Sequence, residues 1–176
     1  MLAGPSVGQF FAERGAEGSK VENPRTGGDV TRSWRGVGEV TDDLSAYFCS
    51  CNWGKKSVLL DLQIETDRKK VIQLAVKSDV IIASYKPGDA EKLGVGYEQI
   101  RMQHPGVIYG MITGYGPDDQ RVGYDAVIQA ESGFMDLNGE KDGPPLKMPV
   151  ALVYVLAAHQ LKEGLLLALL KKEQTG

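Results

Sequence analysis

The stretch that most constrains the fold is the uninterrupted apolar run DVIIA at residues 79–83. Such a run is typical of a β-strand that is buried on both faces. The periodicity of residues 65–77 predicts a helix before it, and residues 57–62 have the composition of another strand. A strand, a helix and a second strand in this order predict a βαβ unit, which places the two strands in parallel.

The rest of the chain extends the same pattern. Further strands are expected at residues 47–52 and 107–113, and helices at residues 5–15, 89–93, 97–104 and 124–133. Residues 17–22 stand where another strand should follow the first helix, but Gly18 and Ser19 weaken its strand propensity. The sequence therefore predicts an α/β fold with a mostly parallel sheet and flanking helices. Ligands of such folds bind beyond the carboxyl ends of the strands, here residues 84–88 and 113–116.

A long helix is expected to close the chain. After Pro149, apolar residues recur at three- and four-residue intervals, Tyr154 lies near the start of the helix, and Gly176 is available as its stop. No uninterrupted apolar run reaches the roughly 18 residues of a membrane span. Polar residues interrupt the middle of the helix, so we expect a buried helix of a soluble protein with no membrane partner: His159, Gln160, Lys162 and Glu163.

Composition narrows the classes of function. A chain of 176 residues suits one domain, residues 1–176, and a net charge of -3 argues against non-specific binding of nucleic acid. Cys49 and Cys51 are read as free thiols of a reducing compartment. The N-terminus has no visible signal peptide, so a cytoplasmic location is expected, or the mitochondrial matrix in a eukaryote.

Recognised chemical motifs are missing from the sequence. It contains no metal-ligand cluster, no phosphate-binding glycine loop of known spacing and no nucleophile elbow. The loop of residues 23–39 carries Arg25, Arg32 and Arg35, which fit either a solvated loop or an anion-binding loop. From these features alone the chain is an α/β domain for which an anionic small molecule is a possible ligand.

Ordered motifs along the whole chain resemble the class III coenzyme A transferases, the CaiB/BaiF group that includes formyl-CoA transferase. They are LAGP (2–5), RGAE (14–17), KVE (20–22), GDVTR (28–32), KKSVLLDL (55–62), KPG (86–88), LGVGY (93–97), ITGYG (112–116), GYD (123–125), GEKDGPP (139–145) and KEQTG (172–176). The resemblance implies a Rossmann-like, CoA-binding domain of an interlocked homodimer. It also implies transfer of CoA from an acyl-CoA to a carboxylic acid, with CoA as substrate and no permanently bound cofactor.

In that family an aspartate near the start of the long helix attacks the donor thioester and later carries CoA as an aspartyl thioester. Counting back from Thr175 and Gly176 places this aspartate at position 154, where the chain has Tyr154. A phenol has a pKa of about 10 and stays protonated at neutral pH, so we expect transfer to be impaired. The alternative is a non-catalytic CoA-binding or dimerisation module. Tyr124 and Asp125 match a tyrosine and an acidic residue that line the family's active site.

The resemblance also assigns positions that contact CoA. Ala3, Leu60, Tyr85 and Leu93 match the pocket for the nucleotide and pantetheine, and Lys92 keeps the charge of an arginine common there. Three other positions depart from formyl-CoA transferase, because Asn23 replaces arginine, Gln63 replaces lysine and Ser84 replaces asparagine. The family also has a strand before the first motif and a further half after the last one. The domain is therefore expected to be incomplete relative to the family fold.

Overall fold

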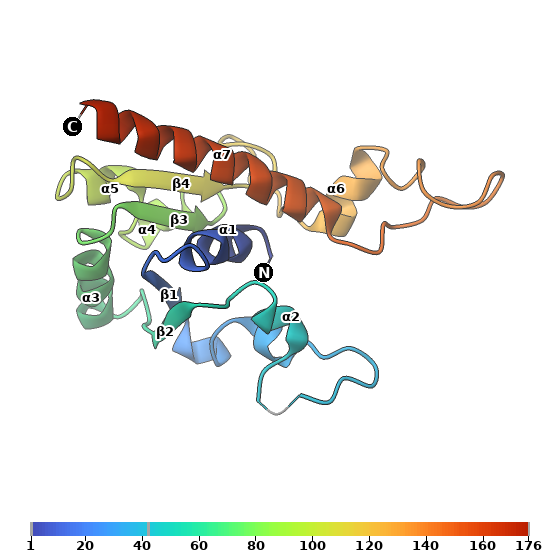
Figure 1. Ribbon diagram of the computed structural model, residues 1–176, viewed down its shortest axis with the longest axis horizontal. Helices are drawn as coiled ribbons and strands as arrows, with labels where there is room; N and C mark the ends of the chain where they lie inside the picture. The colour runs from blue at the N-terminus through green and yellow to red at the C-terminus, as the bar shows by residue number, and fades with distance from the viewer. Residues whose placement is uncertain (1, 42, 176) are drawn as a thin grey trace.

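The computed structural model describes residues 2–41 and 43–175. Its strands are β1 (Gly18–Glu22), β2 (Lys55–Leu59), β3 (Val80–Ser84) and β4 (Ile108–Ile112). Its helices are α1 (Ala3–Ala12), α2 (Ala46–Cys49), α3 (Glu65–Ala75), α4 (Asp89–Lys92), α5 (Tyr97–Arg101), α6 (Asp125–Glu131) and α7 (Leu152–Thr175), with short 3-10 helices η1 (Pro24–Thr26) and η2 (Val30–Ser33). Figure 1 shows α7 running along one side of the molecule, with α6 near its start.

Both strand pairs are parallel, which confirms the α/β prediction. β1 pairs with β2 from Gly18 opposite Lys55 to Glu22 opposite Leu59, and β3 pairs with β4 from Val80 opposite Ile108 to Ser84 opposite Ile112. The pairs form two separate two-stranded sheets, whereas the sequence suggested one sheet. The apolar run of β3 is also less buried than expected, because only Ala83 is fully buried and the run has one strand partner in the described residues.

Helix α1 connects the two sheets. It contacts β1, β2 and β3, and it packs along α7 (Figure 1). Lys55 at the start of β2 ties α1 to the first sheet, since its Nζ donates to the carbonyl oxygens of Pro5 at 2.6 Å and Cys51 at 2.7 Å. Burial lowers the pKa of Lys55 to about 8.

The main core lies where α7 crosses α1 and β4. Val7, Ala158 and Leu165 are fully buried there, among half-buried side chains of the second sheet. Gly110 of β4 permits the close approach, because a Cβ at this position would lie 2.8 Å from the Leu161 Cδ1 atom. The opposite side of α7 exposes a row of leucines: Leu156, Leu166, Leu167 and Leu170.

Helix α7 differs from the sequence expectation about membranes. Within the described residues, it is the one helix long and apolar enough to cross a membrane, judged by length and composition. The polar residues near its middle interrupt the apolar run, but its leucines dominate an 18-residue window. Only 11% of that window is buried, so the expectation of a buried helix was wrong, because α7 packs along one face only. A core helix can pass the same test, so this finding favours neither environment.

Two local predictions were wrong. Residues 47–52 were expected to form a strand, but α2 covers residues 46–49, because the Ser45 Oγ atom accepts a hydrogen bond from the Phe48 N–H at 3.0 Å and caps the helix. Residues 18–22 form β1 despite Gly18 and Ser19, because pairing with β2 outweighs local propensity. The expected stop of α7, Gly176, lies outside the described residues.

Candidate functional site

A cavity of about 230 Å³ lies at the carboxyl ends of β1, β2 and β3. Segments that follow each of these strands supply its walls, so it occupies the edge at which parallel α/β folds bind ligands. Its lining residues are Val21, Glu22, Asn23, Leu60, Asp61, Leu62, Gln63, Tyr85 and Leu93.

Five of the eight positions that resemble CoA contacts line this cavity: Asn23, Leu60, Gln63, Tyr85 and Leu93. The other three lie outside its lining. Ala3 is buried in the first turn of α1, and Ser84 lies beside that turn, because a Cβ on Gly4 would be 3.7 Å from the Ser84 Cβ atom. Lys92 is largely exposed, and its Nζ pairs with Asp89 at 3.2 Å.

The loop arginines do not form an open cationic patch. Arg32 donates two hydrogen bonds to the buried Glu22 carboxylate, at 2.9 and 2.6 Å, and Arg25 donates through Nε to Asp61. The Arg35 Nε donates to Thr41 at 3.2 Å. The positive charges of Arg25 and Arg32 therefore face carboxylates of the same fold, which the sequence order of the loop could not reveal.

Glu22 belongs to this network although it lines the cavity. Burial alone would raise its pKa, but hydrogen bonds from Arg32, Ser57 and the Asp29 N–H lower it to about 2. Its carboxylate is thus an internal partner of the loop rather than a free group facing a ligand.

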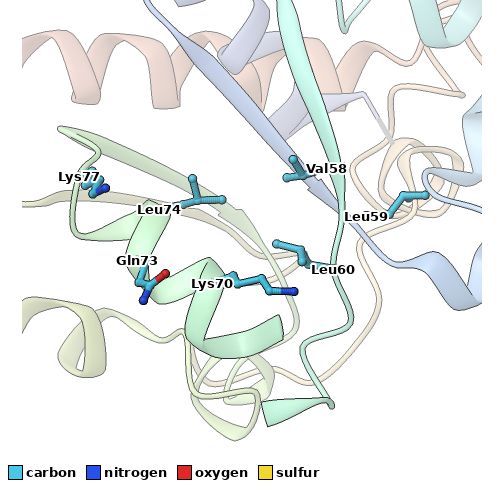
Figure 2. Close-up of a pocket in the computed structure, with 7 residues that line it drawn as sticks. All are labelled: Val58, Leu59, Leu60, Lys70, Gln73, Leu74 and Lys77. Atoms are coloured by element: carbon cyan, nitrogen blue, oxygen red, sulfur yellow. The ribbon is translucent and has the colours of Figure 1, made fainter. Parts of the chain in front are cut away.

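A larger cavity of about 400 Å³ lies between β2 and α3 (Figure 2). Its lining is mostly aliphatic, with two lysines at the helix: Val58, Leu59, Leu60, Lys70, Gln73, Leu74 and Lys77. Figure 2 shows Leu60 and Leu74 projecting into the space between the strand and the helix. It shares only Leu60 with the predicted CoA contacts, and Lys70 pairs with Asp67 at 3.0 Å. We therefore take the smaller cavity as the candidate site.

Tyr154 lies in the first turn of α7, against the loop that precedes α6. Its hydroxyl donates to the carbonyl oxygen of Gly123 at 2.9 Å, and its backbone N–H donates to the Asp125 Oδ1 atom at 3.2 Å. Burial raises the pKa of the Tyr154 phenol above its ordinary value. The phenol is therefore held in its protonated form, because the hydrogen bond to Gly123 requires the proton.

Tyr154, Tyr124 and Asp125 are brought together at the junction of α6 and α7. Asp125 is buried as the first residue of α6, whereas the side chain of Tyr124 is half exposed. The Asp125 Oδ2 atom accepts from Gln129 at 2.6 Å, and Gln129 also accepts from the Met148 N–H at 2.9 Å. Asp125 and Gln129 thus fix the start of α7 and the position of Tyr154.

Sequence reasoning missed two residues around these sites. Asp61 was part of a strand motif, but it is buried at the cavity and holds Arg25. Gln129 was an undistinguished helix residue, yet it is fully buried and links α6 to the chain before α7. A polar residue inside an apolar pattern was the available signal for Asp61, and nothing comparable marked Gln129.

The fold and the cavity define an α/β protein with a cavity at the carboxyl ends of parallel strands. The whole chain, residues 1–176, matches the profile of CoA-transferase family III, and the chain belongs to this family.

Among curated relatives, the probable fatty acyl-CoA transferase Rv3272 of Mycobacterium tuberculosis is 38% identical over 99% of this chain and 45% of its own length. The succinyl-CoA:glutarate CoA-transferase of Mus musculus is 38% identical over 100% of this chain and 40% of its own.

Solved structures agree. A crystal structure of Rv3272 superposes with a TM-score of 0.90 at 37% identity, covering 99% of this chain and 49% of its own. A CaiB/BaiF family protein from Brucella suis superposes with a TM-score of 0.86 at 38% identity, covering 99% of this chain and 47% of its own. The chain therefore spans less than half the length of these relatives.

Proposed function

We propose that this chain is the CoA-binding part of a family III CoA-transferase, built on a Rossmann-like domain. The observation that carries the proposal is the cavity at the carboxyl ends of β1, β2 and β3, which gathers five positions that resemble CoA contacts. Leu60, Tyr85 and Leu93 offer apolar surface to an adenine ring or a pantetheine chain, and Asn23 and Gln63 offer polar groups. The reaction class is transfer of CoA from an acyl-CoA to a carboxylic acid.

We further propose that the chain as it stands binds CoA but does not complete covalent transfer. The family reaction needs a carboxylate that attacks the thioester carbonyl and expels CoA thiolate, leaving a mixed anhydride that the thiolate can attack in turn. At position 154 this chain has a phenol whose pKa is raised by burial and whose proton is donated to Gly123. An attack by this oxygen would have to break that hydrogen bond and would yield an aryl ester instead of an anhydride.

The second candidate function, a non-catalytic CoA-binding or dimerisation module, is favoured by the same residue. The exposed leucine row of α7 also supports it, since an apolar helix face of this kind suits a partner surface. A homodimer is the expected assembly.

The test combines CoA titration with intact-mass spectrometry after incubation with succinyl-CoA. We expect micromolar to millimolar binding of CoA, no covalent CoA adduct on the native chain, and an adduct cleaved by hydroxylamine on the Tyr154→Asp variant. Tyr154→Asn is the matched control, because it has similar size but no nucleophilic carboxylate.

Each result separates the candidates. An adduct on the native chain would overturn the interpretation of Tyr154. CoA binding without an adduct on Tyr154→Asp would favour the binding module. Absence of CoA binding to all three proteins would reject the CoA-transferase and the CoA-binding module, and would leave dimerisation as the remaining role.

A further inference from the structure

The candidate cavity has no cation in its own lining. A site for the nucleotide end of CoA must accommodate phosphate groups, which proteins usually bind with arginine, lysine or backbone N–H groups. The charged residues that line the cavity are both acidic, Glu22 and Asp61. A cation that binds phosphate here therefore comes from beside the cavity.

Two nearby cations pair with carboxylates, and a third contacts a backbone carbonyl oxygen of the lining segment. Arg32 is committed to Glu22 through two hydrogen bonds. Lys92 has a largely exposed side chain that pairs with Asp89. Arg68 lies across Gly94, where a Cβ would be 2.9 Å from its Cδ atom, and its Nη1 atom contacts the Leu62 carbonyl oxygen at 3.5 Å.

Arg25 differs from these three cations. It contacts the lining residue Asp61 through Nε, while its side chain remains 58% exposed. The Asp61 carboxylate is buried and also accepts the Gln63 N–H at 2.9 Å, so it is a fixed anchor for the guanidinium. Because the contact uses Nε, the two terminal nitrogens of the guanidinium, Nη1 and Nη2, are the donors best suited to bind an anion.

The turn that follows β1 explains why Arg25, rather than residue 23, supplies the positive charge. The Asn23 Oδ1 atom accepts the Arg25 N–H at 2.9 Å and caps the short helix η1, so Asn23 shapes the turn instead of contributing charge. The turn then brings Arg25 back to Asp61, 36 residues further along the chain. In formyl-CoA transferase the resemblance places an arginine at the position of Asn23.

We infer that Arg25 is the phosphate-binding residue of this cavity and that Asp61 is its positioning residue. The ligand group is a phosphate of the 3′-phosphoadenosine diphosphate end of CoA. The inference rests on the proposed CoA-binding function and deepens it by naming the residue that supplies the charge.

The test is calorimetric titration of the 176-residue chain with CoA and with dephospho-CoA, which lacks the 3′-phosphate. We expect Arg25→Gln to bind CoA about tenfold or more weakly, because a charge-assisted contact is lost. Arg35→Gln is the matched control from the same loop, and we expect it to retain native affinity. Arg25→Lys should recover part of the lost affinity.

The two ligands identify the phosphate involved. If Arg25 contacts the 3′-phosphate, Arg25→Gln removes the preference for CoA over dephospho-CoA. If it contacts the diphosphate, both ligands weaken equally. Because Arg25→Gln leaves Asp61 buried and unpaired, the double variant Arg25→Gln/Asp61→Asn is measured as well, and its circular dichroism checks that the fold is kept.

The double variant is compared with Asp61→Asn alone, because loss of the Asp61 charge by itself favours an anion. Equal affinity of these two folded variants, for both ligands, would overturn the inference and leave the proposed function standing. If the native chain binds neither ligand, the proposed function fails too. The comparison of native chain and variants therefore separates the two failures.

Discussion

Glu22 illustrates how single residues of this chain combine structural and local electrostatic roles. It ends β1, lines the candidate cavity and joins Arg32 and Ser57. A buried carboxylate is unfavourable unless such partners replace its water. The partners come from the segment of η2 and from β2, so Glu22 holds η2 against the first sheet.

The Glu22 network should make the first sheet sensitive to acid. The pKa values of Glu22 and Asp29 are lowered from 4.5 and 3.8 to about 2 in both cases. A lowered pKa in the folded state contributes stability that is fully present above the unfolded value. The contribution is lost as the pH falls through the folded value, so stability should decline between about pH 4.5 and pH 2.

Replacement of Glu22 should expose this effect. We expect Glu22→Gln to lower stability at pH 7 by about 3 kcal/mol, because Arg32 loses its buried partner, and to flatten the decline at low pH. Urea unfolding followed by the fluorescence of Trp34 and Trp53 would measure both. Glu65→Gln, which removes an exposed ion pair with Lys69, should leave stability almost unchanged, because solvent screens such pairs. Equal effects of the two substitutions would contradict the prediction.

At the level of elements, the loop before α6 is held by contact between two glycines. A Cβ on Gly114 would lie 2.5 Å from the Gly123 N atom and 2.6 Å from its Cα atom, so a side chain there displaces backbone. Gly123 in turn offers its carbonyl oxygen to Tyr154. The close contact thus connects the end of β4 with the start of α7.

We expect Gly114→Ala to destabilise this region by about 2 kcal/mol or more, since the added methyl group cannot be accommodated by side-chain movement alone. Gly164→Ala is the matched control, because a Cβ at that helical position meets no atom within 4 Å. It should stabilise α7 by up to about 1 kcal/mol. Amide exchange of the first turn of α7 would distinguish the two, and similar exchange in both variants would contradict the assignment.

The elements also show what the sequence could and could not predict. The order of strands and helices from residue 57 onward could be predicted from the spacing of apolar residues. Each element buries one face against a neighbour, and that face recurs at a fixed interval in the sequence. Helix α2 was missed because Tyr47, Phe48 and Cys49 have strand-like composition, whereas the Ser45 cap and the following turn decide the conformation. The pairing of Arg25 with Asp61 was invisible, because it depends on how two loops meet.

At the level of the whole molecule, the two sheets are joined through α1, which contacts both. In the described residues no strand pairing links β1 to β3, and the main buried cluster lies with α7 and the second sheet. Several large apolar side chains are exposed, among them Trp53 and Leu59. Independent regions of this kind unfold at different free energies.

We therefore expect a broad thermal transition of low cooperativity. Calorimetry should give a van't Hoff enthalpy that differs from the calorimetric enthalpy, because the transition is not two-state. Tryptophan fluorescence, which reports on the first sheet and its loops, should change at a lower temperature than the far-UV circular dichroism, to which α7 contributes as the longest helix. A single sharp transition with equal enthalpies would contradict this expectation.

The cavity is lined by residues from both sheets. Asn23, Leu60 and Gln63 belong to the first sheet and its loops, whereas Tyr85 and Leu93 follow the second. The width of the cavity therefore depends on the position of the two sheets relative to each other, and both sheets contact α1. A nucleotide bound in this cavity would contact residues from both sheets, so its binding free energy should also stabilise the position of one sheet relative to the other.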